Sequence, residues 1–429
     1  MDWKQELLSR MIAIPSPSRE EKELADMLEK HLQEEGLPVH RMKNNLWLES
    51  CPPCGKPVIL LNAHIDTVKP VSGWSSDPFT PAIVPESTPE GAEDMKIIGL
   101  GANDDGGSVV AMLEAYKILV AHEQPYRLVL TLTAEEEVSG KNGIELILPF
   151  VCGEESLPLQ IEGRGQGKAS ENGNGNSAEN ACSEPVSKSL CYPGDDRIAL
   201  AVVGEPTGMQ MAVAEKGLMV LDCTAYGKSG HAARNEGVNA IYKALPVVEW
   251  FENHRFEKVS PFLGPVKMSV TQIQAGTQHN VVPDKCSFVV DVRSNDCYTN
   301  TELLSEIQAG VKNVVMSEPV AKHTVCAGEG LAESWDTGDL SSVEIKARST
   351  RLGSSRIDVE HPVVQRGLAL GLNCFGSPTL SNQALLHCPT LKIGPGDSAR
   401  SHTANEFIRL SEIDQAVDLY VKLLGDLHL

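Results

Sequence analysis

The sequence predicts an α/β fold in which a doubly wound domain is interrupted by a smaller, inserted α+β domain. In the first half of the chain, short continuous apolar runs alternate with helical segments, which is the pattern of buried parallel strands covered by helices. After about residue 210 the pattern changes to alternating, hairpin-like strands, and near residue 356 the first pattern resumes. One domain is therefore predicted to lie within the other.

The large domain is predicted from helices and strands that follow one another in order. Residues 18–36 carry leucines at helical spacing behind Ser18, which is placed as a helix N-cap, and residues 107–122 form a second helix. Functional residues of such a sheet gather at the carboxyl ends of its strands. The apolar runs that predict buried strands span residues 57–66, 126–134 and 197–206.

The inserted domain is predicted to have the order β-α-β-β-α-β, a small sheet with helices on one face. Its central strands read KMSVTQIQAG and KCSFVVDVRS, a second helix lies near residues 301–315, and residues 341–353 supply a last strand. A Gly-, Ser-, Asn- and Glu-rich stretch at 163–190 has little to bury and is predicted to be a surface insertion. The predicted domains are 1–210 and 356–429 for the large domain and 211–355 for the inserted one.

Length and composition set the broad class. A chain of 429 residues is long for one core, and 41% hydrophobic residues with a mean hydropathy of −0.16 describe an ordinary soluble protein. No apolar run approaches the roughly 20 residues of a membrane-spanning helix. The net charge of −21 argues against nucleic acid or an anionic membrane as partner. The start has Asp2 and Glu6 and no long apolar core, so no secretory signal is expected.

The cysteines favour a reducing compartment. Eleven cysteines are scattered along the chain, an odd number that suits reduced thiols in the cytoplasm better than a disulfide framework. Cys51 and Cys54 form a lone CxxC pair around two prolines. We interpret this pair as a turn in preference to a zinc ribbon, because no second pair follows at ribbon spacing.

Acidic and histidine residues recur at the predicted strand ends. The stretch LTLTAEEEVSG, residues 130–140, ends a buried strand on three glutamates, and such a run is either a solvated turn or part of a cation site. NAHIDTV places His64 and Asp66 on one face, while Asp104 enters a helix where it would also serve as an N-cap. Glu205 and His402 complete a mixture of histidine and carboxylate that suits Zn²⁺ better than calcium.

Seven motifs together resemble the M20 family of metallopeptidases and deacylases over nearly the whole chain. The resemblance implies a catalytic domain of zinc-peptidase-like architecture and an inserted lid or dimerisation domain. It also implies a homodimer formed through that lid. The motifs, in order, are NAHIDTV, GANDDGGS, TAEEEVSG, VVGEPTGM, GKSGHAARNEGVNAI, QHNVVPDKCSFVVDVR and GPGDSARSHTANEF.

The resemblance assigns roles to the candidate residues. Asp104 would bridge two Zn²⁺ ions per chain, with Co²⁺ as an alternative metal. Glu136 would be the general base, and Asp66 would support the histidine ligand. The remaining ligands would be His64 and Glu205 on one ion and Glu137 and His402 on the other.

In the lid, His231 would stabilise the oxyanion, either in its own chain or across the dimer. Asn280 and Arg293 match positions that hold a substrate carboxylate, although Arg293 could equally form a structural ion pair. Two departures from the family pattern stand out. Gly106 stands where the family commonly has lysine. Residues 375–386 do not clearly match the family's substrate-loop pattern.

The sequence therefore predicts a cytoplasmic, metal-dependent hydrolase of linear amides whose substrate is a small N-acyl amino acid. An enzyme like acetylornithine deacetylase, acting on N-acetyl- or N-succinyl-ornithine in arginine biosynthesis, is the first hypothesis. Succinyl-diaminopimelate desuccinylase and an M20 dipeptidase or carboxypeptidase are alternatives within the family. A metal-binding scaffold without activity is the alternative outside it, and it is disfavoured because every ligand and the base are present.

Overall fold

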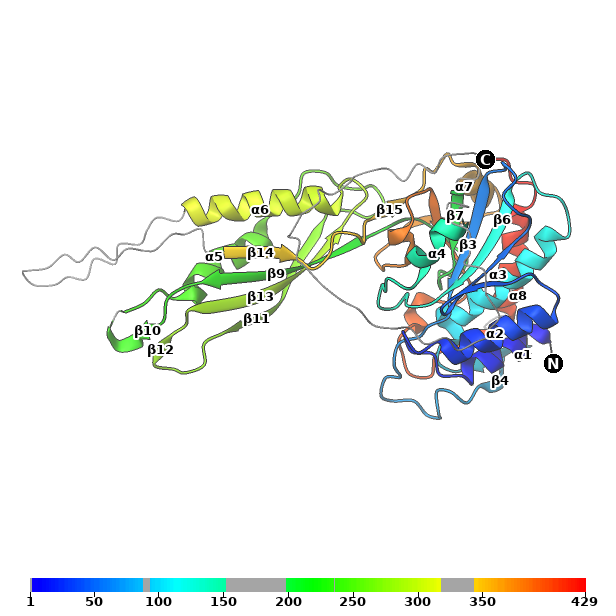
Figure 1. Ribbon diagram of the computed structural model, residues 1–429, viewed down its shortest axis with the longest axis horizontal. Coiled ribbons are helices and arrows are strands. Elements are labelled where there is room, and N and C mark those ends of the chain that lie inside the picture. Colours follow the sequence, from blue (N-terminus) through cyan, green and yellow to red (C-terminus); the bar gives the residue numbers. More distant parts are fainter. Residues whose placement is uncertain (1, 88–92, 152–197, 235, 318–342) are drawn as a thin grey trace, which may run out of the picture.

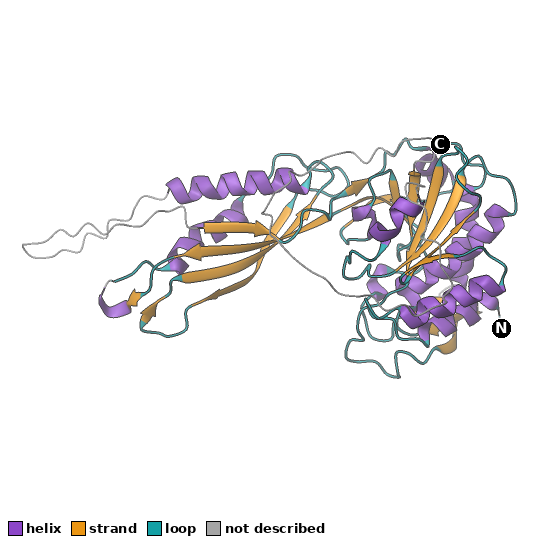
Figure 2. Ribbon diagram, in the orientation of Figure 1, coloured by secondary structure: helices purple, strands orange, loops and turns teal. Residues whose placement is uncertain are grey.

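The computed structural model describes residues 2–87, 93–151, 198–234, 236–317 and 343–429. The expected insertion at 163–190 lies outside the described residues. Figures 1 and 2 show a large sheet packed between helices, from which a narrower lid extends to one side. Both chain termini lie on the large unit. Among the described helices, none is both long and apolar enough to cross a membrane.

The large sheet has nine strands in the order β1-β2-β6-β3-β7-β17-β8-β15, and β16 pairs with β8 off this path. Its centre is parallel, because β3 pairs in parallel with both β6 and β7, and β7 pairs in parallel with β17. The strands are β1 (His40–Met42), β2 (Asn45–Glu49), β3 (Val58–His64), β6 (Arg127–Thr133), β7 (Ile198–Val203), β8 (Met211–Glu215), β15 (Ser355–Arg356), β16 (Cys374–Ser377) and β17 (Thr390–Lys392).

Helices cover both faces of this sheet, and the predicted apolar runs are its central strands. Every residue of β3 and β6 is buried, as continuous apolar runs require when both faces of a sheet are covered. The main core lies between the sheet and the helices α1, α2, α3, α7 and α8, while α4 packs on the other face. These helices are α1 (Trp3–Ile12), α2 (Lys22–Glu34), α3 (Gly107–Val120), α4 (Ile144–Val151), α7 (Pro362–Ala369) and α8 (Leu410–Leu424).

A three-stranded sheet lies beside this core. Its strands are β4 (Ala82–Ser87), β5 (Glu93–Ile98) and β18 (Phe407–Arg409), in the order β18-β5-β4. It connects two segments that lie far apart in the sequence, because β18 pairs with β5. The segment after β5 enters α3 through a π-helical turn at Ala102–Gly106, and the segment before β18 carries His402.

The lid follows the predicted β-α-β-β-α-β order and packs two helices on one antiparallel sheet. The lid has its own hydrophobic core, formed by the buried side chains of its sheet and of both helices. The sheet order is β11-β13-β9-β14, and a two-stranded ribbon, β10-β12, stands apart from it. The elements are β9 (Gly217–Tyr226), β10 (Gly230–His231), α5 (Ala240–Asn253), β11 (Lys267–Ala275), β12 (Val281–Val282), β13 (Lys285–Ser294), α6 (Asn300–Ser317) and β14 (Val343–Ala347).

The start of the lid differs from the predicted boundary at residue 211. Strand β8, Met211–Glu215, pairs with β15, β16 and β17 of the large sheet, and its side chains are all buried there. The alternating burial that marks the lid sheet begins only with β9 at Gly217. The apolar side chains of β8 pack in the core of the large domain. The boundary between the large domain and the lid therefore falls at Lys216.

Candidate active site

The carboxyl ends of three parallel strands, β3, β6 and β7, lie at the same edge of the large sheet. Strand β3 ends on His64, which lies in register with Thr133 at the end of β6. Glu136 and Glu137 follow β6, and Glu205 follows β7, which pairs with the other side of β3. Side chains that are far apart in the sequence therefore meet at this edge, as expected of an open α/β sheet.

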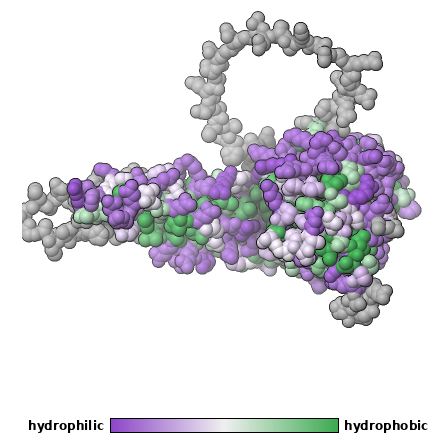
Figure 3. Space-filling view, turned by 90° about the horizontal axis from the view of Figure 1, so that it is seen from below, coloured by the Kyte–Doolittle hydropathy of each residue, from purple (hydrophilic) through white to green (hydrophobic). Residues whose placement is uncertain are grey.

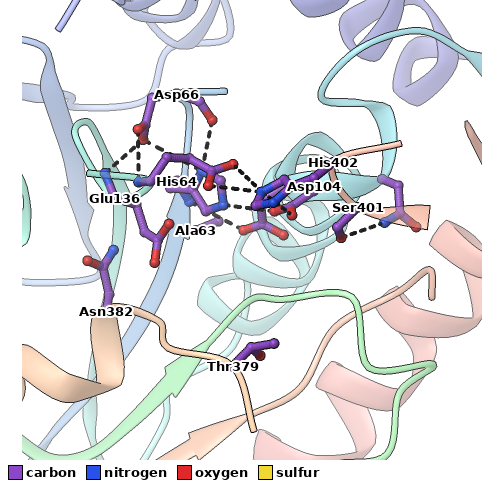
Figure 4. Close-up of polar contacts among 12 residues, drawn as sticks. Ala63, His64, Asp66, Asp104, Glu136, Thr379, Asn382, Ser401 and His402 are labelled. Carbon is purple, nitrogen blue, oxygen red and sulfur yellow. Dashed lines mark hydrogen bonds and ion pairs between the residues drawn. The ribbon is translucent and has the colours of Figure 1, made fainter. Parts of the chain in front are cut away.

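Asp104 lies at the centre of this cluster. It projects from the π-helical turn that enters α3, and its Oδ1 lies 3.0 Å from Nε2 of His64. Its Oδ2 lies 3.7 Å from Nε2 of His402, which in turn lies 3.0 Å from Oε2 of Glu137. Figure 4 shows His64, Asp104 and His402 converging from separate segments.

Among the described residues, two groups have donor atoms placed to hold a metal ion. In each group the offered ligand atoms lie within 4.8 Å of one another, and Asp104 belongs to both. One group is His64, Asp104 and Glu205, and the other is Asp104, Glu137 and His402. The structure thus brings together all five residues that the sequence predicted as ligands.

The charge balance of the cluster fits bound cations. Burial, followed by the neighbouring acids, raises the pKa of Glu136 well above its usual range, and the same causes raise the pKa of Glu205. Carboxylates this close together in a buried space cannot all ionise without a compensating positive charge. Histidine nitrogen and carboxylate oxygen are the donors that Zn²⁺ and similar ions accept. The residues present therefore fit a pair of divalent cations.

The pKa values of the two histidines are also consistent with a cluster rich in negative charge. Burial opposes protonation of His64, but its hydrogen bonds to Asp104 and Asp66 hold its pKa well above the usual range. The hydrogen bond to Glu137 raises the pKa of His402 to about 9. A metal ion must displace these protons before either nitrogen can act as a ligand, so metal binding should be weaker at lower pH.

Asp66 organises the glutamate turn as well as His64. Its Oδ1 accepts the backbone N–H of Glu136 at 3.0 Å, and its Oδ2 accepts that of Glu137 at 3.1 Å. His64 Nδ1 lies 2.9 Å from the carbonyl oxygen of Asp66 and 3.6 Å from its carboxylate. Ser18 donates its hydroxyl to the same carboxylate at 2.7 Å, so the prediction that Ser18 caps a helix is wrong. Helix α2 instead begins at Lys22.

The three consecutive glutamates occupy three different environments. Glu137 contacts His402 in the cluster and Glu136 lies beside Asp66 and His64 (Figure 4), whereas Glu135, with a positive φ of 57°, makes its side-chain contacts elsewhere. Glu135 accepts a hydrogen bond from the side-chain amide of Asn142 at 2.8 Å and is buried in the turn that follows. The turn therefore separates Glu135 from the other two glutamates, while Glu136 and Glu137 remain close enough to raise the pKa of Glu136.

Sequence reasoning gave no role to two buried acids beside the cluster, Glu406 and Asp105. Glu406 is buried and accepts the backbone N–H groups of Asn103 and Asp104, at 2.8 and 3.0 Å, and burial raises its pKa to about 8. Asp105 is buried behind His64 and accepts its backbone N–H at 3.3 Å. Glu406 stands four residues after His402 in the quoted motif SHTANEF, which was the available signal.

Two of the predicted lid residues lie far from this cluster within one chain. His231 forms β10 and is exposed, and the carbonyl oxygen of Asn280 accepts the N–H of Ala232 next to it, at 3.1 Å. Figure 1 places β10 and β12 at the end of the lid that points away from β3. A single chain therefore does not bring His231 to its own cluster.

Arg293 lies at the other end of the lid, near the large sheet. It pairs with Leu218 at the start of β9, and the length of β13 separates it from Asn280. Its guanidinium makes a two-pronged contact with Asp291, at 2.9 and 3.2 Å. Asn280 and Arg293 therefore do not come together within one chain to hold one carboxylate.

Comparison with known proteins matches two parts of the chain to family profiles. The profile described as a peptidase dimerisation domain of the M20 type matches residues 213–317, which include most of the lid. The profile described as peptidase family M28 matches residues 48–148. That second stretch carries His64, Asp104, Glu136 and Glu137.

Curated relatives match almost the full length. The succinyl-diaminopimelate desuccinylase of Stenotrophomonas maltophilia is 25% identical over 434 residues, covering 98% of this chain and 97% of the relative. The enzyme of the same name from Cereibacter sphaeroides is 22% identical over 435 residues, with the same coverage.

Solved structures share the fold. A tripeptidase from Staphylococcus aureus superposes with a TM-score of 0.64 at 16% identity, covering 98% of both chains. A dinuclear metal-binding peptidase of the M20 family from Bacillus subtilis superposes with a TM-score of 0.63 at 14% identity, covering 99% of this chain and 97% of that one. In its matched lid profile, its full-length relatives and its two-unit fold, the chain is similar to M20 peptidases, which are hydrolases of amide bonds.

Proposed function

We propose that this protein is a dinuclear metal-dependent deacylase that removes a succinyl group from the nitrogen of an amino acid. The observation that carries the proposal is the cluster in which Asp104 joins two groups of metal-ligating side chains beside Glu136. The names of the full-length relatives favour an N-succinyl substrate over the N-acetylornithine of the first hypothesis. Hydrolysis of N-acetylornithine remains the second candidate, because the metal cluster suits both acyl groups.

Bound divalent cations, Zn²⁺ first and Co²⁺ as an alternative, would acidify a water molecule and polarise the amide carbonyl. The residues that would hold them are His64 and Glu205 on one side, Glu137 and His402 on the other, and Asp104 between. Glu136 would accept the proton of the attacking water and deliver it to the departing amine. Asp66 holds Glu136 in place through its backbone N–H, so the base keeps its position during the transfer.

Cations at the base of the lid support a substrate with more than one carboxylate. Lys267 lies opposite Arg293 where β11 pairs with β13, and burial together with these two charges lowers the pKa of Lys216. The backbone N–H of Lys216 donates to Ser377, which begins the segment beside the candidate site. A succinylated amino acid has a carboxylate at each end, and clustered cations are suited to hold one of them.

The substrate proposal is tested directly by hydrolysis. Purified protein loaded with Zn²⁺ should hydrolyse N-succinyl amino acids, including succinyl-diaminopimelate and succinylornithine, with a higher kcat/KM than their N-acetyl counterparts. Chelation should abolish the activity, and added Zn²⁺ or Co²⁺ should restore it. A preference for N-acetyl substrates would favour the acetylornithine candidate. Cleavage of dipeptides alone would support a peptidase, and metal binding without any hydrolysis would support a scaffold.

Arg293 provides a prediction about carboxylate recognition. Arg293→Ala should lower kcat/KM for a free acid substrate by roughly 10- to 150-fold, the loss of one charge-assisted contact worth about 1.5–3 kcal/mol. The methyl ester of that carboxylate should be affected much less. Asp291→Asn is the matched control, because it removes the ion-pair partner and leaves the guanidinium. If both variants lose the same activity on acid and ester, Arg293 serves only the ion pair.

The lid supports a homodimer formed along β11. In the described sheet β11 is an edge strand, and its second half is exposed, including Ile273 at 51%. Tyr242 and Leu245 on α5 are also exposed, and Figure 3 shows hydrophobic side chains gathered along part of the lid. An open edge strand pairs readily with its copy around a two-fold axis. Ile273→Lys should therefore shift the protein to a monomer in light scattering.

A dimer would bring His231 of one copy to the cluster of the other. Mixing His231→Ala with Glu136→Gln should then restore about a quarter of wild-type activity, because half of the random dimers are hybrids with one intact site each. Each parent alone should be nearly inactive. Subunit exchange should be followed with labelled chains. If subunits exchange but activity does not recover, His231 does not act in the partner's active site.

A further inference from the structure

A buried ion pair lies behind the candidate site and has no role in the chemistry described so far. Lys392 Nζ lies 2.7 Å from Oε2 of Glu215, and the two side chains are 2% and 0% exposed. Lys392 ends β17, and Glu215 ends β8, its neighbour in the large sheet. Burying two charges is costly unless hydrogen bonds satisfy their remaining atoms, so the partners of this pair indicate its purpose.

The remaining hydrogen bonds of the pair go to one short segment. Glu215 accepts the backbone N–H of Ser381 at 3.0 Å and its hydroxyl at 2.6 Å. Lys392 donates to the carbonyl oxygen and to the hydroxyl of Thr379, both at 3.2 Å. Each charged group thus holds one end of residues 379–381. These four hydrogen bonds help to satisfy both buried charges, and all of them go to this one segment.

This segment borders the candidate site. The next residue, Asn382, donates its side-chain amide to Asn62 at 2.9 Å and to Thr133 at 3.1 Å, near the carboxyl ends of β3 and β6. Figure 4 shows Asn382 beside Glu136, with Thr379 below the cluster in this view. The segment is therefore fixed at Asn382 by the strands of the site and at residues 379–381 by the ion pair.

We propose that the Lys392–Glu215 ion pair positions residues 379–382 as a wall of the substrate site and so sets substrate affinity. This inference rests on the proposed function, because the wall is assigned to the acyl amino acid that the site would bind. Lys392 and Glu215 are positioning residues, since they act through the segment they hold. Among the described residues neither makes a hydrogen bond to a candidate ligand, although the positive charge of Lys392 acts on the carboxyl groups of Glu205 and Glu136. The same geometry accounts for two charges buried side by side at the ends of β8 and β17.

The test replaces the pair by apolar side chains of similar size. The double variant Lys392→Met/Glu215→Leu leaves no unpaired buried charge, so the protein should fold, and its bound metal should match wild type. KM for the best substrate should rise about 10- to 100-fold, as expected when a positioned wall moves by about 1 Å, whereas kcat should change by less than about threefold. Backbone amides of residues 377–386 should exchange hydrogen faster.

The matched control is the ion pair of the buried Arg127 with the half-buried Glu49, which lies at the opposite end of β6 from the site. Arg127→Met/Glu49→Leu should alter the melting temperature without changing KM or exchange at 377–386. Ser381→Ala is a milder variant that keeps both charges and should raise KM about threefold to tenfold, on the order of one lost hydrogen bond.

An unchanged KM and unchanged exchange in a folded, metal-loaded Lys392→Met/Glu215→Leu protein would overturn the proposal. If that variant does not fold, an unchanged KM and exchange in Ser381→Ala would overturn it. Hydrogen exchange needs no substrate, so it tests the positioning of residues 379–382 independently of the proposed deacylase function. Faster exchange in a protein that cleaves no N-acyl amino acid would contradict the proposed function and support the positioning of the segment.

Discussion

Glu136→Gln should reduce kcat by about 10²- to 10⁴-fold, the usual contribution of a positioned general base, while both metal ions stay bound. The substitution keeps the shape of the side chain and the backbone N–H that Asp66 accepts. It removes only the group that would take the proton from water. Steady-state kinetics beside metal analysis of the same preparation measures both quantities. KM should change little, because Glu136 is not assigned to substrate binding.

The neighbouring glutamates provide matched controls within the same turn. Glu137→Gln should lower metal affinity first and activity as a consequence, because Glu137 belongs to the second ligand group. Glu135→Gln should leave the bound metal and kcat close to wild type and lower the melting temperature, because Glu135 is buried against Asn142. If Glu136→Gln loses metal and Glu137→Gln keeps it, the two roles are reversed. If all three variants are active and metal-loaded, the run is a charged turn.

Asp104→Ala should empty both metal positions and reduce hydrolysis on the order of 10³-fold or more, since the metal-dependent part of the barrier is lost. Asp104 belongs to both ligand groups, so one substitution removes a donor from each. It also leaves His64 and His402 without their shared acidic neighbour. Metal analysis after dialysis should show a fall from close to two ions per chain to nearly none.

A remote acid controls for general effects of charge removal. Asp222→Ala on the lid sheet removes a carboxylate that pairs with Arg348, and it should leave metal content and kcat unchanged. Circular dichroism should show that both variants are folded. Full metal occupancy in Asp104→Ala would contradict the bridging role. Loss of one ion alone would assign Asp104 to a single position.

Local patterns in the sequence predicted the strands, and the resemblance of the motifs to a known family predicted the candidate ligands. Strands β3 and β6 are largely apolar and fully buried, as expected of strands in a sheet covered on both faces. His64, Glu136, Glu137 and Glu205 stand directly after or at the end of such runs, so their common location follows from the parallel order of the sheet. The β-α-β-β-α-β order of the lid was predicted in the same way, from the change of hydrophobic period.

The domain boundary and the hydrogen-bond partners of single residues could be assigned only from the tertiary structure. The predicted lid begins at residue 211, but the pairing of β8 with β17 assigns Met211–Glu215 to the large sheet. Ser18 reads like a helix cap, but its hydroxyl binds Asp66, 48 residues away. Propensity at one position cannot distinguish these outcomes, because both sets of contacts satisfy the same local preferences.

The sequence by itself determined the fold class, the inserted lid, and the set of acids and histidines that form the candidate metal site. Only the tertiary structure decided that Arg293 faces Asp291, that Asn280 lies a strand's length from it, and that Lys392 and Glu215 hold residues 379–381. The physical reason is that hydrophobic burial follows local periodicity, which a sequence displays directly. Ion pairs and hydrogen bonds join side chains whose proximity depends on the order of strands in the sheet, and that order is a property of the whole chain.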